Sequence, residues 1–545
     1  MLTHLMMREL PSLAGPGASF WTTGADHILS IAWCETCACY LHPAVPLCPQ
    51  CFASPVPRAV AGTATVVAAS TNHHAWLPGH TPPYVVAIVE LDAAPAVRLT
   101  TNLIDCPTAD DYLGLAVEVR FIQHEDIWLP CFAPRPSAAR VAVADPLPLP
   151  RRVPPAVTRV DKYEDRVAIT GIGQSALGRK LERGAAALTI DACRAALDDA
   201  GLCIADIDGL CAYPGSDGLP GISQGGVRML EAALGIQPLW HCGAHEVAGQ
   251  TGNLQTAMLA VAAGLCRHVL CFTSFAQAQR PSALARQSGR ITGELAWQLP
   301  YGAASPANWI ALYASHYLHR FGVKREALAS IAIAARQHAA RNPLALYQAP
   351  LSLDDYLGAR MIAWPFGLYD CDVPCDGAMA VVISSRRASV DLRQPAISVE
   401  AVGSHITEHQ SWDQGPLSQQ RNVFGPAAHL WSRTAMRASD VDVALLYDGF
   451  TFNVFSWLEG LGFCAPGEAA QFIADGARIG PGGALPLNPH GGQLAAGRSN
   501  GYGNVLEAVT QLRHQAGARQ VANARVAVVS SGGGIPAGCM LLRND

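Results

Sequence analysis

The chain has 545 residues, half of them apolar and 15% charged, and its net charge at pH 7 is −5. Such a length corresponds to three or four domains of about 150 residues, and the high apolar content excludes a disordered protein. The small negative charge excludes a basic surface for nucleic acid or anionic lipid. No apolar run reaches the roughly 18 residues of a membrane helix, and no secretory signal pattern opens the chain. Because most of its 17 cysteines stand in apolar segments, we expect a cytoplasmic protein.

Residues 1–135 are predicted to form a small domain made mostly of β-strands. Runs of β-branched or alternating apolar residues occupy 62–70, 84–91 and 115–123, and Pro or Gly bounds these runs. Such runs are typical of strands. We therefore expect an all-β structure in this part of the chain.

The clearest local motif in this part is a pair of Cys-x-x-Cys knuckles. Cys34 and Cys37 form the first, and Cys48 and Cys51 form the second after ten intervening residues. Four thiolates at this spacing can surround one Zn²⁺ tetrahedrally and leave no open position for a substrate. The spacing therefore predicts a structural zinc ribbon at about 30–55, with no catalytic role for the metal.

The ribbon and its flanking residues resemble the zinc-ribbon/OB-fold acyl-CoA-associated family (domain of unknown function 35). The resemblance covers about 15–135. It rests on FW at 20–21, the ribbon, GTATV at 62–66, PYVVAIVEL at 83–91 and LPCF at 129–132. Members of this family partner thiolase-like proteins, as subunits or as fusions, and some bind acyl-CoA. The resemblance implies an OB-fold domain after the ribbon.

Residues 136–165 are rich in Pro and Arg, show no apolar periodicity and are predicted to form an extended linker. After them, short apolar runs alternate with Ala-rich helical patterns. The runs stand at 166–171, 267–273, 378–384, 441–447 and 524–530, and the first helix is expected at 186–200. Strands that alternate with helices indicate parallel sheets covered by helices on both faces. We expect one domain over 166–545, in two similar halves at about 166–390 and 391–545.

Several stretches of this domain resemble the thiolase superfamily, in its sterol-carrier/lipid-transfer branch. They are VAITGIG at 167–173, DIDGL at 206–210, RNP at 341–343, DGAMAVV at 376–382, LGFC at 461–464 and NPHGGQ at 488–493. The resemblance implies an α/β thiolase fold, in which two doubly wound halves form a five-layered αβαβα core. It also implies a homodimer and a CoA thioester as the substrate.

The residues that a thiolase needs for catalysis are replaced at four positions. By the resemblance, Val247 and Ser530 stand at the two cysteines, Arg498 at the histidine of the GHPxGA motif and Tyr447 at the asparagine of the NExF motif. A thiolase acts through a cysteine thiolate that forms an acyl-enzyme. Claisen condensation through an acyl-enzyme is therefore not expected.

The stretches LYDGFT at 446–451 and LGFC at 461–464 are most similar to the thiolase-like aldolases of bacterial steroid side-chain degradation. Those enzymes pair with the same zinc-ribbon/OB family and cleave a β-hydroxyacyl-CoA by a retro-aldol reaction. The resemblance implies that this chain is a fusion of both parts. It also implies that a bulky substrate is cleaved to a ketone and a short acyl-CoA such as propionyl-CoA or acetyl-CoA. A hot-dog-fold hydratase is the expected partner.

Retro-aldol cleavage needs a base for the β-hydroxyl and a stabiliser for the enolate, but no nucleophile. The aldolase family uses two tyrosines. The first corresponds to Tyr447, whereas Arg498 stands at the second and Tyr502 follows one helical turn later. Because a nearby guanidinium favours the phenolate, we expect Tyr447 to be the base, assisted by Arg498, with Tyr502 as acid or oxyanion donor. Asp448 can orient these groups.

Two histidines complete the predicted site, and each has a structural alternative. His245 lies in the loop that holds the nucleophile in thiolases, and His490 stands beside two glycines. Either can line the substrate pocket or only support the local backbone. Arg498 can bind a CoA phosphate or a carboxylate instead of taking part in catalysis. Two other functions also stay open, namely an inactive acyl-CoA scaffold and an acyltransferase with an unusual nucleophile.

Overall fold

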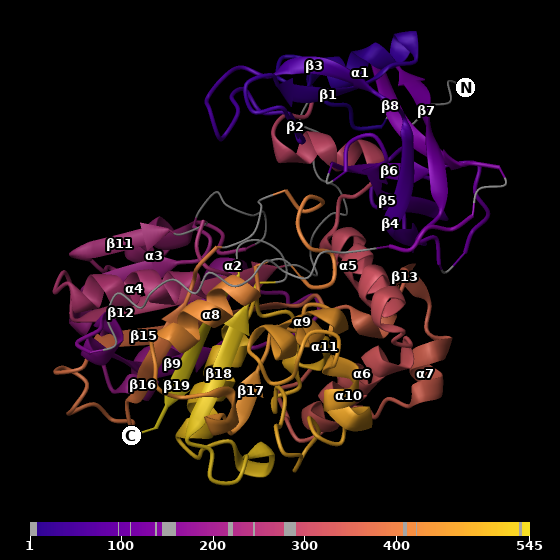
Figure 1. The fold of residues 1–545 in the computed structure, drawn as a ribbon. Coiled ribbons are helices and arrows are strands. Elements are labelled where there is room, and N and C mark those ends of the chain that lie inside the picture. Colours follow the sequence, from indigo (N-terminus) through magenta and orange to yellow (C-terminus); the bar gives the residue numbers. More distant parts are fainter. Residues whose placement is uncertain are drawn as a thin grey trace.

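The computed structural model shows the chain as two parts that pack against each other (Figure 1). The structure describes residues 8–95, 97–109, 111–136, 139–143, 160–215, 222–243, 246–276, 290–406, 411–420, 422–532 and 537–544. Among these residues, no helix is long and apolar enough to cross a membrane.

The N-terminal part contains a small antiparallel sheet and a barrel. The small sheet is formed by β1 (Leu29–Cys34), β2 (Cys39–Leu41) and β3 (Val56–Val60), with α1 (Ala18–Thr22) packed beside it. The barrel strands are β4 (Thr63–Asn72), β5 (Tyr84–Leu91), β6 (Arg98–Leu103), β7 (Ala116–His124) and β8 (Ile127–Pro134). Because β4 pairs with both β5 and β7, the sheet closes on itself, as an OB fold requires. The expected strands are confirmed as β4, β5 and β7.

A nine-stranded sheet runs through the rest of the chain. Its strands are β9 (Val167–Gln174), β10 (Gly209–Ala212), β11 (Trp240–Gly243), β12 (His268–Ala276), β15 (Asp376–Ser385), β16 (Ile397–Gly403), β17 (Val443–Leu445), β18 (Val526–Ser531) and β19 (Gly538–Arg543). Their order is β11-β10-β12-β15-β9-β16-β19-β18-β17. The first strand of each half, β9 or β16, stands at the centre, and the last strand of each half, β15 or β19, lies next to it. This repeat confirms the predicted two-half architecture.

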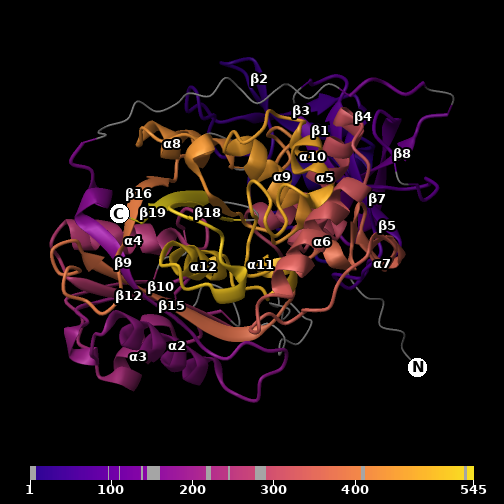
Figure 2. The ribbon, with the colours of Figure 1, turned by 90° about the horizontal axis from the view of Figure 1, so that it is seen from below.

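The helices form three layers around this sheet, which Figure 2 shows from below. They are α2 (Ala185–Ala200), α3 (Gly226–Leu234), α4 (Gly252–Ala262), α5 (Pro306–Phe321), α6 (Glu326–Ala339), α7 (Leu353–Gly358), α8 (Phe424–Ser432), α9 (Thr451–Gly460), α10 (Ala469–Ile473), α11 (Gly492–Ala495) and α12 (Tyr502–Leu512). α2 and α3 cover the first half, α8 and α9 cover the second, and α4 and α12 share one apolar cluster between them. The two halves of the sheet form the two β layers between these three helix layers, so the five-layered thiolase fold is confirmed.

The two parts of the chain share a buried interface. Two short strands, β13 (Met361–Ala363) and β14 (Phe366–Gly367), extend the barrel sheet beside β4. Asn308 on α5 donates a hydrogen bond to Asn72 on β4 at 2.6 Å, and Thr100 donates to Asp413 at 2.7 Å. All four side chains are buried, so separation of the parts would leave polar groups without their partners.

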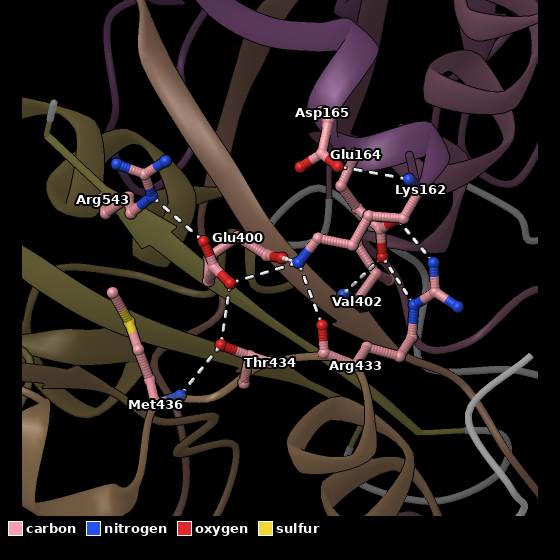
Figure 3. Close-up of polar contacts among 9 residues, drawn as sticks. All are labelled: Lys162, Glu164, Asp165, Glu400, Val402, Arg433, Thr434, Met436 and Arg543. Carbon is pink, nitrogen blue, oxygen red and sulfur yellow. Dashed lines mark hydrogen bonds and ion pairs between the residues drawn. The ribbon is translucent and has the colours of Figure 1, made fainter. Parts of the chain in front are cut away.

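The end of the predicted linker is held against the second half by charged residues (Figure 3). Lys162 donates to Glu400 Oε1 at 3.1 Å and to the Arg433 carbonyl oxygen at 3.0 Å. Arg433 also makes two hydrogen bonds to Glu164, at 2.8 and 2.6 Å, a bidentate geometry that fixes both groups. The linker prediction is therefore wrong for these last residues, because Lys162 and Glu164 are buried. Residues 144–159 lie outside the described part of the chain.

Candidate active site

Tyr447 lies between the end of β17 and the start of α9, and its side chain is only 7% exposed. Its backbone N–H donates to Ser530 Oγ at 2.9 Å. Gln250 lies in the loop before α4, and its Nε2 donates to the Tyr447 hydroxyl oxygen at 3.4 Å. The loops before α4 and α9 therefore meet at this hydroxyl, although they belong to different halves of the fold.

A second glutamine, Gln493 on α11, contributes another buried amide to this site. Its Oε1 accepts from the Gly501 backbone at 3.3 Å, whereas its Nε2 is buried and has no hydrogen-bond partner among the described residues. Burial raises the pKa of the Tyr447 phenol, and the nearby Gln493 side chain opposes part of this rise. A buried donor without a partner carries a desolvation cost that a bound oxygen would remove.

Arg498 is ion-paired with a buried carboxylate that the sequence analysis did not single out. Its Nη2 contacts Asp372 Oδ1, and the Asp372 side chain is 6% exposed, whereas the Arg498 side chain is 33% exposed. Burial alone lowers the pKa of the Arg498 guanidinium. The Asp372 charge raises this pKa by more than burial lowers it, so Arg498 stays charged. The pair therefore presents a fixed cation at the rim of the site.

The expected net lowering of the Tyr447 pKa by Arg498 is not found. Burial raises the pKa of Tyr447, the Asp372 charge raises it again, and Arg498 only partly opposes these effects. The phenol is consequently neutral near pH 7. The sequence alone could not show this balance, because it depends on burial and on a carboxylate distant in the chain.

Asp448 holds the loop that carries Gln493. Its Oδ1 accepts from the Gln493 backbone at 2.9 Å, and its Oδ2 accepts from the Leu494 backbone at 3.5 Å. A Cβ at Gly492 would lie 1.9 Å from Asp448 Oδ2, so only glycine permits this approach. Burial raises the pKa of Asp448 to about 7. Asp448 therefore holds the start of α11 through its backbone, and the expected orientation of Tyr447 and Arg498 by Asp448 stays a prediction.

The structure does not bring Tyr502 and His490 to the Tyr447 hydroxyl. Tyr502 is fully buried between α4 and α12 and shares a hydrogen bond with Asn253. The backbone oxygen of His490 accepts from Asn342 at 2.8 Å, and burial lowers the pKa of its ring to about 3. Both contacts hold the fold, and the expected place of the His490 ring in the substrate pocket stays a prediction. His245 lies outside the described residues.

Two cysteines accompany Asp372 and Arg498. Cys375 Sγ contacts the Arg498 carbonyl oxygen at 3.5 Å, and burial raises the pKa of its thiol to about 12. Burial and the neighbouring Asp370 raise the pKa of Cys371 well above its ordinary value. Neither thiol is therefore prepared as a nucleophile, since the thiolate is the reactive form.

The four predicted zinc ligands meet at one point of the small N-terminal sheet. The sulfur atoms of Cys34, Cys37, Cys48 and Cys51 all lie within 4.8 Å of one another. Four sulfurs around a tetrahedral Zn²⁺ lie about 3.8 Å apart, given Zn–S bonds of about 2.3 Å. The cluster therefore fits a structural zinc ion.

A cavity of about 760 Å³ separates this sheet from residues 291–297. It is lined largely by apolar and aromatic side chains, among them Trp21, His42 and Trp297. None of the residues predicted as catalytic lines it, so the cavity and the Tyr447 site are separate features.

Sequence reasoning missed three polar residues of the site, although each stands in or near a stretch that it considered. Gln250 ends the loop that holds the thiolase nucleophile, and Gln493 ends the NPHGGQ stretch. Asp372 stands between Cys371 and Cys375. Glutamine and aspartate are common in loops, so only their convergence on Tyr447 reveals them.

Two segments of the chain match known families. Residues 406–540 match the family described as thiolase C-terminal domain-like, and residues 57–121 match the family described as ChsH2, C-terminal OB-fold domain. The two matches correspond to the two parts of the structure.

The chain is also similar to characterised proteins over most of its length. It is 33% identical over 390 residues to the steroid side-chain-cleaving aldolase of Thermomonospora curvata, covering 69% of this chain and 98% of the relative. It is 32% identical over 390 residues to the 17-hydroxy-3-oxo-4-pregnene-20-carboxyl-CoA lyase of Mycobacterium tuberculosis, covering 69% and 99%. The solved structure of an Ltp2-ChsH2(DUF35) aldolase has a TM-score of 0.64 at 31% identity, covering 70% and 98%.

The burial of Asp448 predicts a specific pH dependence of stability. An unfolded aspartate has a pKa of about 3.9, so the folded value of about 7 means that the native state retains a proton that the unfolded state loses between these two pH values. The stability of the wild type relative to Asp448→Asn should therefore fall by about 1.4 kcal/mol per pH unit between about pH 4 and pH 7. Urea unfolding of both proteins across this range measures the difference, and a constant difference would contradict the assignment.

Proposed function

We propose that this chain, which belongs to the family of steroid side-chain-cleaving aldolases of the thiolase superfamily, cleaves a bulky β-hydroxyacyl-CoA by a retro-aldol reaction. The products are a ketone and a short acyl-CoA such as propionyl-CoA or acetyl-CoA. The observation that carries the proposal is the site itself. On a thiolase fold, the position of the catalytic asparagine holds Tyr447, whose buried hydroxyl contacts Gln250 rather than a reactive thiol.

The chemistry of the site matches a reaction that generates an enolate. When the Cα–Cβ bond breaks, the thioester oxygen takes up negative charge, which nearby donors stabilise. The neutral Tyr447 phenol, the unpartnered Gln493 Nε2 and the charged Arg498 are three such donors. We assign Tyr447 to this side of the reaction, as a hydrogen-bond donor to the enolate oxygen, because its raised pKa makes it a poor base.

A steroid acyl group is the favoured substrate, because the names of both relatives describe steroid chemistry. In 17-hydroxy-3-oxo-4-pregnene-20-carboxyl-CoA the hydroxyl group is on the carbon β to the thioester, so its cleavage would yield a 17-ketone and propionyl-CoA. A hydratase that supplies the β-hydroxyacyl-CoA stays a prediction of the sequence resemblance.

The aldolase function predicts cleavage of this CoA ester by the purified chain. Mass spectrometry should detect propionyl-CoA and the matching ketone, and Tyr447→Phe should lower kcat/KM by about 100-fold or more, since the loss of a hydrogen bond to a developing oxyanion costs at least that much. Tyr502→Phe is the matched control and should retain kcat/KM within about threefold, because its hydroxyl faces Asn253. Intact substrate with tight binding would instead support a scaffold, and an acylated cysteine peptide would support an acyltransferase.

We propose that the four-cysteine cluster binds one structural Zn²⁺. The close approach of the four sulfur atoms supports this, as does the burial of Cys34 and Cys48. Elemental analysis should find one zinc ion per chain, and Cys34→Ser combined with Cys48→Ser should abolish binding. Cys39→Ser, which alters a neighbouring cysteine outside the cluster, should keep the metal. Wild-type protein that binds no zinc when zinc is supplied would contradict the proposal.

We also propose that the chain forms a homodimer through β11. Among the described residues this strand ends the nine-stranded sheet and pairs with β10 alone, so its other edge can pair with a second copy. Leu239 directly precedes β11, and Leu259 and Leu265 lie on and just after α4, which contacts β11. They are 78%, 47% and 54% exposed. Light scattering should give twice the chain mass of 57.5 kDa. Leu259→Glu should give monomers, whereas Leu344→Glu, at another exposed leucine, should not.

A further inference from the structure

Asp372 and Tyr447 are packed around the same glycine. The Asp372 backbone N–H donates to the Gly449 carbonyl oxygen at 3.0 Å. A Cβ at Gly449 would lie 2.7 Å from Tyr447 Cε1 and 3.2 Å from the Tyr447 hydroxyl oxygen. The Tyr447 hydroxyl therefore lies beside Gly449, whose backbone is hydrogen-bonded to the Asp372 backbone. Consistent with this, the Asp372 charge acts directly on the Tyr447 pKa.

Asp372 differs from Asp370 and Asp448, two other buried aspartates near it, in what its oxygens contact. Asp370 accepts from the Tyr356 and Thr451 hydroxyls through Oδ1 and from the Gly367 backbone through Oδ2. Asp448 has both oxygens on the α11 backbone. Asp370 and Asp448 are therefore fully engaged in holding the fold.

In Asp372, by contrast, Arg498 contacts Oδ1 and the described residues offer no hydrogen bond to Oδ2. The Arg498 side chain is a third exposed and the Asp372 side chain 6% exposed, so the pair connects the buried site with the surface. The buried Arg498 Nε also has no hydrogen-bond partner among the described residues. The pair therefore holds one carboxylate oxygen and one guanidinium N–H that the described residues leave without a hydrogen bond.

We propose that Asp372 is the base that accepts the proton of the β-hydroxyl group, with Arg498 holding its carboxylate in place. This assignment rests on the aldolase function proposed above. The hydroxyl proton moves to Asp372 Oδ2, and the O–H electron pair forms the carbonyl of the ketone. The Cα–Cβ electron pair moves to the thioester as an enolate, which Tyr447 stabilises. Asp372 then returns the proton to Cα, which restores the carboxylate and releases the short acyl-CoA.

The electrostatics agree with this role. Burial raises the pKa of Asp372 above its ordinary value, and Arg498 opposes the rise without cancelling it. A general base is most effective when its pKa lies closer to the working pH. A buried carboxylate beside a permanent cation meets this condition better than a neutral phenol. The arrangement thus divides the two tasks of the reaction between Asp372 and Tyr447.

The test is the pH profile of kcat/KM for cleavage of 17-hydroxy-3-oxo-4-pregnene-20-carboxyl-CoA. Asp372→Asn, which keeps the shape of the side chain, should lower kcat/KM by about 100-fold or more. Its residual activity should lose the acidic limb that protonation of the base produces in the wild type. Asp370→Asn is the matched control in the same segment. It should lower thermal stability but retain the wild-type acidic limb.

A second variant covers the case in which Asp372→Asn does not fold. Arg498→Gln removes the cation that favours the ionised carboxylate, so the acidic limb should move to higher pH by one unit or more. An Asp372→Asn enzyme within threefold of wild type, or an acidic limb unchanged in Arg498→Gln, would overturn the assignment while the aldolase function stood. A wild-type chain that does not cleave the CoA ester would instead refute the function on which the assignment rests.

Discussion

The antiparallel pairing of β9 with β16 holds the two halves of the thiolase-like part together. It is short, with Ile169 opposite Ile397 and Ala168 opposite Ser398, yet it joins the two halves into one nine-stranded sheet. Because the halves meet there, α4 and α12 are enclosed between them and bury their apolar faces in one cluster. The loops that precede α4 and α9 then converge from the two halves. Without this pairing, nothing would hold Gln250 from the first half beside Tyr447 from the second.

Burial determines the chemistry at the point of convergence. It raises the pKa of Tyr447, Asp372 and Asp448 alike, because a charged group loses more solvation than a neutral one. Arg498, a permanent cation in contact with this set, acts on Asp372 directly because it is ion-paired with that residue. The same burial therefore leaves the phenol neutral and the carboxylate as the better base. A thiolase fold without its cysteines can in this way still supply a proton acceptor and a stabilised enolate.

The N-terminal part is bound to the thiolase-like part by more than chain connectivity. Buried hydrogen bonds such as Asn308 to Asn72 join them, and β13 continues the barrel sheet. Such contacts remove polar groups from water on both sides, so the two parts should unfold together. The relatives align with about two thirds of this chain, whereas here an OB-fold part is covalently joined to the aldolase part. A fused arrangement keeps the two parts at a fixed ratio and in contact.

The fold class, the strands and helices with strong periodicity, the cysteine cluster and the family could all be predicted from the amino-acid sequence, because they depend on local patterns. β4, β5, β9 and α2 fall where the apolar runs predict them, and the two Cys-x-x-Cys knuckles bring their own ligands together. The sequence also identified Tyr447, since that residue lies in a family motif. The residues that contact Tyr447, by contrast, became visible once the chain was folded. Tyr502, one turn from Arg498 in sequence, points into the core, whereas Asp372 reaches Arg498 across more than a hundred residues. The burial of a residue and the charges around it depend on residues distant in the chain, so a local sequence pattern cannot predict them.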